Sequence, residues 1–263
     1  MPSFPVPVLF SSSMQCVSWC RPVLPVALPE NEIHIWRAWL DLEPQERDRL
    51  SSYLSEDERA RASRFVFQHD REHFLVARGR LRELLGSYLH RSPQSLEFRT
   101  GRYGKLSLAD RNDLRFNLTH SYGLALYAFA MNRELGIDVE KIRPEFASEG
   151  IAERYFSAAE QNELRKLPVN LRTSAFFLCW TRKEAYVKAH GGGLQIPLES
   201  FDVSLTPGKP ETLRSTDSER WNLRSFEPAP EYIASLIGEG ATESLCFWDM
   251  GVDPALKPAS HSI

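Results

Sequence analysis

Two carboxylates stand two residues apart within a short apolar run, in the segment ELGIDVEKI at residues 134–142. In an extended strand, side chains alternate between the two faces, so Asp138 and Glu140 share one face. The apolar Ile137 and Val139 share the other. An edge strand with one solvated face is the commoner reason for such a pattern. A site for a hard cation is the alternative, because adjacent carboxylates repel each other unless a metal ion or a proton relieves them.

A second group of reactive side chains lies in the segment WTRKEAYVKAHGGGL. Trp180, Glu184 and Lys188 are spaced four apart, so they line one face of a helix, whereas Lys183 points away from that face. A Glu–Lys pair at this spacing is also a common surface ion pair, worth about 0.3–0.5 kcal/mol. His120 follows an apolar strand at the mouth of a turn, where most histidines are structural or exposed. Spacing alone therefore leaves structural and functional interpretations open.

Capping signals and apolar periodicity predict the helices that carry these residues. Ser-x-x-Glu capping boxes at 55–58 and 157–160 each open a helix. Asp70 is expected to cap a longer helix with apolar residues on one face and three arginines opposite (Arg71, Arg78, Arg82). The longest helix, at about 171–189, holds the Trp–Glu–Lys face and ends at the glycines 191–193.

Strand patterns occupy the rest of the chain. Residues 31–42 and 115–121 each read as a strand, and 123–142 reads as a hairpin that turns at Asn132, Arg133 and Glu134. Further strand-like pieces lie at 201–205, 221–226, 232–237 and 244–248. Each half runs helix and then strands, without alternating strands and helices, which predicts an α+β fold. We expect a tail at 1–30, an N-terminal half at 31–136 and a C-terminal half at 137–263.

Bulk composition narrows the class of function. The 263 residues carry a formal net charge of −3, whereas proteins that bind nucleic acid usually carry a basic excess, so we expect no nucleic-acid partner. Residues 57–115 differ, with 13 Arg and Lys against 8 Asp and Glu. This suits a solvated helix face or a site for a polyanionic small molecule. No apolar run approaches membrane-spanning length, so we expect no membrane partner.

The first thirty residues hold many prolines, and they lack the basic start and continuous apolar core of a secretory signal. We therefore expect a mobile tail, with Met14 as an alternative start, and a cytoplasmic protein. Four cysteines are too few and too scattered for a disulfide framework. Cys16 and Cys20 have no second pair of ligands near them in the sequence, so the spacing predicts no zinc site there.

Taken in order, the segments FNLTHS, GIDVE and WTRKEAYVKAHGGGL resemble the three signature segments of the 4′-phosphopantetheinyl transferases. The likeness is closest to the surfactin-synthetase-activating (Sfp) type, whose single chain contains two pseudo-symmetric halves. Length and layout agree from roughly residue 30 to 250. The resemblance implies two such halves here, each a small antiparallel-rich sheet packed with a long helix, and a monomer.

The resemblance also implies roles for the acidic and basic residues. Asp138, Glu140 and Glu184 would be ligands of Mg²⁺, and Lys188 would contact the phosphates of coenzyme A near the leaving group. Thr119 and His120 would hold the nucleotide end of coenzyme A. Three further basic residues match phosphate-contacting positions of the family (Arg61, Arg99, Lys105). Departures from the family pattern are Thr for Ser at 119, Leu for Pro at 106, Glu at 58 and His at 69.

The implied reaction is transfer of the 4′-phosphopantetheine arm of coenzyme A to a serine of an apo acyl or peptidyl carrier protein, with release of 3′,5′-ADP. Glu184 is the candidate base, and Asp138 and Lys188 complete the catalytic set. One alternative is another magnesium-dependent nucleotide hydrolase or transferase that needs no protein acceptor. The other is a coenzyme A or carrier-binding module without chemistry, although such a binder would not need these carboxylates.

Overall fold

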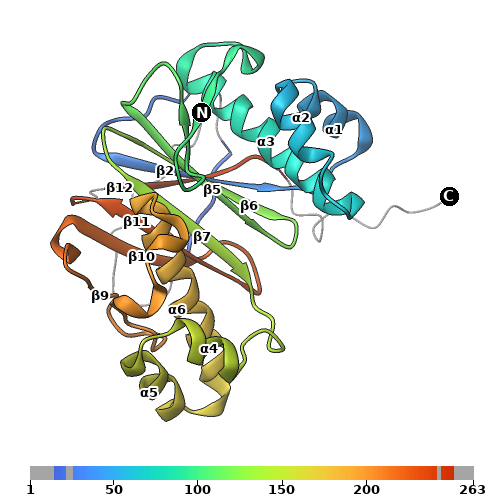
Figure 1. The fold of residues 1–263 in the computed structure, drawn as a ribbon. Helices are drawn as coiled ribbons and strands as arrows, with labels where there is room; N and C mark the ends of the chain where they lie inside the picture. The colour runs from blue at the N-terminus through green and yellow to red at the C-terminus, as the bar shows by residue number, and fades with distance from the viewer. Residues whose placement is uncertain (1–14, 22–25, 242–243, 252–263) are drawn as a thin grey trace.

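The computed structural model describes residues 15–21, 26–241 and 244–251 (Figure 1). Two four-stranded sheets dominate it. One has the order β12-β2-β6-β5, formed by Ser244–Asp249, Glu32–Trp39, Leu124–Met131 and Leu114–Ser121. The other has the order β1-β10-β11-β7, formed by Gln15–Cys16, Trp221–Glu227, Tyr232–Glu239 and Leu135–Lys141. Most pairings are antiparallel, as predicted.

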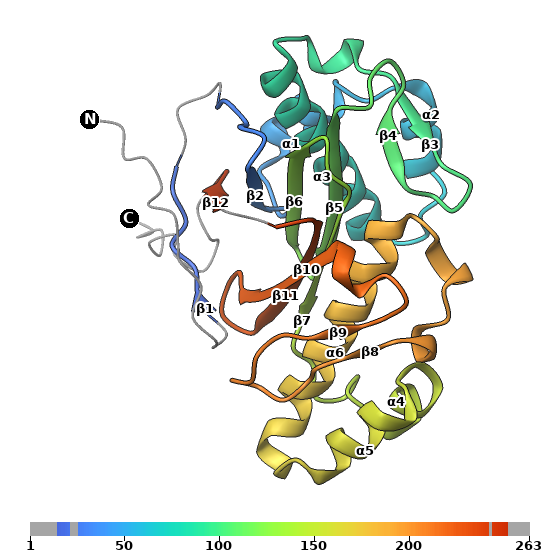
Figure 2. The same cartoon turned by 90° about the vertical axis from the view of Figure 1, so that its left-hand side faces the viewer.

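Each sheet is packed with one 22-residue helix, α3 (Gln68–Leu89) on the first and α6 (Val169–His190) on the second. Figures 1 and 2 show α3 and α6 at different ends of the molecule, with the sheets between them. Shorter elements complete the halves: α1 (Pro44–Ser51), α2 (Glu56–Ala62), β3 (Phe98–Thr100), β4 (Leu106–Leu108), α4 (Glu149–Tyr155), α5 (Ala158–Lys166), β8 (Asp202–Val203) and β9 (Leu213–Arg214). The α+β class is confirmed.

Three main hydrophobic clusters hold these layers together. One lies beneath α3, one beneath α6, and the third fills the space between the two sheets. Strand β6 contributes to two of them, because residues 124–130 are buried on both faces. A strand covered on both sides can be apolar throughout, which explains why this segment shows no polar alternation. None of the helices in the described ranges combines the length and the hydrophobicity that a membrane span requires.

The predicted hairpin at 123–142 is wrong. Strand β6 pairs with β2 and β5, whereas β7 pairs with β11 in the other sheet. The hairpin is instead β5–β6, which turns at Tyr122 and Gly123, both with positive φ. After β6 the chain crosses between the sheets, because Ile137 and Val139 belong to the core between them. Burial of that apolar face, rather than the nearest strand in sequence, determines the pairing of β7.

Helix α3 differs from the prediction at its start and on its polar face. It begins at Gln68, with no side-chain cap, so Asp70 lies within the first turn. Arg71 is exposed as expected, but Arg78 and Arg82 are buried beneath α2 and the loop after α3. Both predicted capping boxes are present, at Ser55 and at Ser157.

The two halves exchange strands at their ends. Strand β12, from the end of the chain, pairs in parallel with β2 of the first sheet. Strand β1 pairs in parallel with β10 of the second sheet. The structure therefore differs from the expected tail at residues 15–16, while residues 1–14 and 22–25 lie outside the described residues.

Candidate active site

A pocket of about 870 Å³ lies between the two halves. Side chains from α2, α3 and β5 form one wall, and side chains from α4 and α6 form the other. Among the lining residues are Arg61, Arg78 and His120 on the first wall and Trp180, Glu184 and Lys188 on the second. The helical face predicted for Trp180, Glu184 and Lys188 therefore exists and faces this pocket. Basic and acidic groups meet across it.

Asp138 contacts Lys188 from behind the pocket wall and does not itself line the pocket. Its Oδ1 accepts hydrogen bonds from Lys188 Nζ at 2.5 Å and from Thr119 Oγ1 at 3.0 Å. Strand β7 is an edge strand, but α6 covers its polar face, so Asp138 is only 4% exposed. Its Oδ2 is buried and has no hydrogen-bond partner among the described residues. A buried carboxylate oxygen without a partner costs free energy, which indicates that a ligand completes this site.

Two more carboxylates lie near Asp138. Glu140 Oε2 accepts a hydrogen bond from Ser121 Oγ at 2.7 Å, and the Glu184 carboxylate has no side-chain hydrogen bond among the described residues. Burial, together with the charge of Asp138, raises the pKa of Glu140 to about 7 and also raises the pKa of Glu184. Burial raises the pKa of Asp138 against the opposing effect of Lys188. Such carboxylates are stabilised in their charged form by a cation.

The chemistry of these donors fits Mg²⁺, which prefers oxygen ligands and carboxylates in particular. The unpartnered Oδ2 of Asp138 supports the same conclusion. The three carboxylates do not form a compact group, however, because their oxygens do not all lie within 4.8 Å of one another in the described residues. An ion bound here would have to draw Glu184 and the two β7 carboxylates together.

His120 projects from β5 and lines the pocket. The residue is exposed, yet the surrounding walls desolvate the ring. This desolvation, helped by the nearby His73 and Lys188, lowers the pKa of His120. The neutral form of the ring is therefore favoured.

Lys105 lines the pocket but already has three oxygen partners. Its Nζ donates to Glu134 Oε2 at 2.7 Å, to the carbonyl of Ala189 at 2.7 Å and to the carbonyl of Leu135 at 3.3 Å. The ammonium thus ties the 101–105 loop to the start of β7 and the C-terminal end of α6. A Cβ at Gly191 would lie 2.9 Å from Lys105 Cδ, which explains a glycine there.

Of the other two basic residues predicted for the site, one lines the pocket and one does not. Arg61 lines the pocket and stacks over the ring of Phe74, with 5.5 Å from Cζ to the ring centroid. Arg99 is exposed and does not line the pocket; its Nη2 lies 3.4 Å from the carbonyl of Leu108. The structure therefore brings Arg61, Lys105, His120 and Lys188 together and leaves Arg99 outside.

Arg78 is a pocket residue that sequence reasoning placed on an outer polar face. It is 8% exposed, lines the pocket, and its Nη1 has no hydrogen-bond partner among the described residues. Its Nε is 3.4 Å from Glu58, whereas Arg82, one turn later, is fully partnered by Glu58 and two carbonyls. The i, i+4 relation of Arg78 to the apolar Phe74 is the signal that could have identified it.

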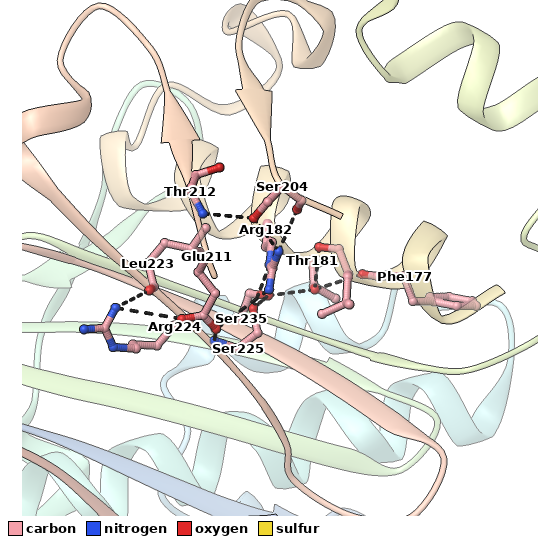
Figure 3. A network of polar contacts seen from close by, with 11 residues as sticks. Phe177, Thr181, Arg182, Ser204, Glu211, Thr212, Leu223, Arg224, Ser225 and Ser235 are labelled. Carbon is pink, nitrogen blue, oxygen red and sulfur yellow. Dashed lines mark hydrogen bonds and ion pairs between the residues drawn. The ribbon is translucent and has the colours of Figure 1, made fainter. Parts of the chain in front are cut away.

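The rotation of α6 is fixed by a polar network on the side facing β10 and β11 (Figure 3). Arg182 donates to Ser225 Oγ at 2.9 Å and to the carbonyl of Ser204 at 2.6 Å. Thr181 Oγ1 is 2.8 Å from Ser235 Oγ. Because these contacts hold one face of the helix against the sheet, Glu184 and Lys188 must face the pocket.

Sequence comparisons with known proteins identify one family. The model of the 4′-phosphopantetheinyl transferase superfamily matches residues 134–237. The 4′-phosphopantetheinyl transferase HetI of Nostoc sp. is 38% identical over 226 residues, 85% of this chain and 94% of that protein. The 4′-phosphopantetheinyl transferase Sfp of Bacillus subtilis is 30% identical over 192 residues, 73% and 84% of the two chains. A solved holo-(acyl-carrier-protein) synthase from Bacillus anthracis aligns with a TM-score of 0.36 and 21% identity, over 41% of this chain and 96% of that one.

Proposed function

The chain belongs to the 4′-phosphopantetheinyl transferase superfamily, and from this premise we propose the reaction of this pocket. The enzyme transfers the 4′-phosphopantetheine arm of coenzyme A to a serine of an apo carrier protein and releases 3′,5′-ADP. The observation that carries the assignment of residues is the meeting of Glu184, Lys188 and His120 in one pocket, in front of Asp138. Both walls come from a single chain, which supports a monomer as the active form.

In this proposal Asp138, Glu140 and Glu184 hold Mg²⁺. When bound, the ion offsets negative charge on the pyrophosphate of coenzyme A. The unpartnered oxygen of Asp138 and the raised pKa values of its neighbours support this role. Thr119 orients Asp138 through its hydroxyl hydrogen bond.

Lys188 and His120 bind the phosphates of coenzyme A. The Lys188 side chain is 28% exposed, lines the pocket and forms an ion pair with Asp138. Its charge can therefore act on the pyrophosphate as the bond to the leaving group breaks. His120 and Arg61 line the same pocket and suit the nucleotide phosphates. We add Arg78 to this set, because its guanidinium has a nitrogen without a partner, and a phosphate oxygen would supply one.

The serine hydroxyl of the carrier attacks the β-phosphorus of coenzyme A. A new oxygen–phosphorus bond forms, the bond to the 3′,5′-ADP oxygen breaks, and the serine proton must leave. Glu184 is the candidate acceptor, because it lines the pocket and makes no competing hydrogen bond among the described residues. In the metal-free protein, burial and the charge of Asp138 raise the pKa of Glu184, and a raised pKa makes a carboxylate a stronger base.

The proposed function is tested by incubating the protein with coenzyme A, Mg²⁺ and an apo carrier protein, followed by intact mass measurement of the carrier. Gain of one phosphopantetheine arm, with one equivalent of 3′,5′-ADP, is the expected result. Release of 3′,5′-ADP without an adduct would instead identify a hydrolase. Tight binding of coenzyme A with neither product would identify a module without chemistry.

The role of Arg78 is tested by Arg78→Met against Arg82→Met. Loss of a charged hydrogen bond to phosphate should weaken coenzyme A binding about tenfold in Arg78→Met, equivalent to roughly 1.4 kcal/mol. Arg82→Met should reduce stability and leave the affinity of the folded protein unchanged, because Arg82 does not line the pocket. Equal coenzyme A affinity in Arg78→Met and wild type would remove Arg78 from the site.

A further inference from the structure

A second cluster of metal-ligating side chains lies at the other edge of the first sheet, away from β5 and the pocket. Glu32, His34 and Cys246 place one ligand atom each within 4.8 Å of one another. His34 Nε2 is 3.1 Å from Glu32 Oε2, and Cys246 Sγ is 3.2 Å from the same oxygen. His34 is 1% and Cys246 5% exposed, whereas the Glu32 side chain is 26% exposed. The ligand atoms of His34 and Cys246 are therefore buried, and Glu32 connects the cluster to solvent.

The sheet register accounts for this geometry. Strands β2 and β12 are parallel neighbours, and His34 stands directly opposite Cys246. Glu32 is two residues before His34, so both side chains lie on one face. Backbone pairing thus fixes the positions of all three side chains, although Cys246 is more than 200 residues from the other two in sequence.

A second hydrogen bond, at the nitrogen that faces away from Glu32, orients the imidazole of His34. Its Nδ1 is 2.7 Å from Tyr88 Oη, which accepts a hydrogen bond from Trp36 Nε1 at 2.7 Å. A phenol oxygen has two lone pairs, so it can accept from Nδ1–H as well. This would leave Nε2, the nitrogen that faces Glu32 and Cys246, free to bind a metal. Histidine ligands in metal sites are commonly held by such a partner on their other nitrogen.

We propose that Glu32, His34 and Cys246 form a binding site for Zn²⁺ that joins β12 to β2. A carboxylate, an imidazole and a thiolate are all zinc ligands, and the thiolate makes Mg²⁺ a poor competitor. Tetrahedral zinc at ordinary bond lengths separates such ligand atoms by about 3.3–3.6 Å. The two measured separations need to lengthen by only a few tenths of an ångström, and water can take the fourth position.

Metal binding would change the tautomer of His34 and the protonation state of Cys246. Without metal, Nε2–H and the Cys246 thiol can both donate to Glu32, so the trio is satisfied by hydrogen bonds. With metal, the His34 proton moves to Nδ1 and points at Tyr88. Cys246 loses its proton to solvent as its sulfur bonds the ion. One proton is released for each zinc bound, so affinity must rise with pH.

Cobalt titration of the full-length, chelator-treated protein tests the site. Co²⁺ should bind at one equivalent and produce the sulfur-to-metal absorption of a thiolate ligand, and one equivalent of Zn²⁺ should remove it. Excess Mg²⁺ should not. Zn²⁺ should also raise the melting temperature until one equivalent has been added. Titration without thiolate absorption and without thermal stabilisation would overturn the proposal.

Variants locate the ion. Cys246→Ser should abolish the absorption, whereas Cys20→Ser, a control thiol that pairs through its backbone with the same strand, should keep it. Tyr88→Phe retains the bulk of the side chain and should weaken zinc binding about 10- to 100-fold. If Cys246→Ser does not fold, His34→Gln should still lower affinity. Absorption that survives in Cys246→Ser, or unchanged zinc affinity in both His34→Gln and Tyr88→Phe, would refute the assignment.

Discussion

Two lysines lie five residues apart on α6, and each forms an ion pair with a buried carboxylate. Lys183 Nζ donates to Glu160 at 2.8 Å and to the carbonyls of Leu198 and Phe201, both at 2.6 Å. Lys188 Nζ donates to Asp138 and lies 3.2 Å from Thr119 Oγ1. Lys183 is fully buried, while Lys188 is partly open to the pocket.

The difference between the two regions is whether their polar groups are completely partnered. Glu160 also accepts hydrogen bonds from the backbone of Ser157 and Val203, so every strong donor and acceptor around Lys183 is paired. Around Lys188, one oxygen of Asp138 has no partner, and the Glu184 carboxylate makes no side-chain hydrogen bond among the described residues. A completed network stabilises the fold, whereas an incomplete one indicates a place for a ligand.

The largest expected effect is a loss of stability in the region around Lys183 and Glu160, where the polar groups are completely partnered (the completed region). Lys183→Ala leaves Glu160 charged and buried without its partner, which should reduce the free energy of unfolding by about 3–5 kcal/mol. Urea unfolding at 25 °C measures this change. Turnover of the molecules that remain folded should stay close to wild type. A loss below 1 kcal/mol would mean that the pair does not hold α5 to α6.

Lys188→Ala should show the opposite profile. Removal of the charge that acts on the pyrophosphate should lower kcat about 10²–10³-fold, the usual cost of losing one such group. The unfolding free energy should fall less than in Lys183→Ala, because Asp138 keeps its Thr119 hydrogen bond and can take up a proton. Steady-state kinetics on a carrier protein decide the matter. Near-normal turnover would make Lys188 only a partner of Asp138.

Magnesium should bind in the region around Lys188, where one oxygen of Asp138 and the Glu184 carboxylate lack hydrogen-bond partners among the described residues. At 100 times its dissociation constant, Mg²⁺ should stabilise the protein by about 2.7 kcal/mol, which thermal unfolding can detect without any substrate. Asp138→Asn and Glu184→Gln should each reduce this gain. Glu160→Gln is the matched control, since it alters a carboxylate of the completed region and should keep the full gain. A gain equal in all four proteins would place the ion elsewhere.

The smallest expected effect lies in a third cluster, around Asp217 beyond the end of α6. Burial would raise the pKa of Asp217, but hydrogen bonds from Tyr186, Trp221, His190 and Ser215 lower it well below its usual range. A lowered pKa means that the carboxylate stabilises the fold above about pH 4 and loses this effect as the pH falls. Asp217→Asn should therefore cost about 1 kcal/mol at pH 7.

Acid unfolding tests the origin of this effect. The difference in unfolding free energy between wild type and Asp217→Asn should shrink as the pH is lowered below 4, because the wild-type carboxyl then takes up a proton. A difference that stays constant from pH 7 to pH 3 would show that packing, and not charge, is responsible. Transfer activity of the folded variant should not change, since Asp217 does not line the pocket.

Local patterns were sufficient for much of this molecule. Both capping boxes, the pocket face of α6 and the shared face of Asp138 and Glu140 follow from spacing in the sequence. They are predictable because helix and strand geometry repeat over a few residues, so neighbours in sequence fix the direction of a side chain. The order of the three signature segments likewise indicated the family.

The environment of each side chain was decided by tertiary structure. Sequence alone could not show that Asp138 is buried or that Arg78 points into the pocket. Nor could it show that the Lys105 ammonium is already hydrogen-bonded to β7 and α6. Nor could it bring Cys246 to Glu32 and His34. These features depend on which distant surfaces pack together, and β7 joins β11 rather than β6 because burial of its apolar face outweighs proximity along the chain. The sequence determined which groups could act together on one element, and the packing of the two halves decided which of them lack a partner.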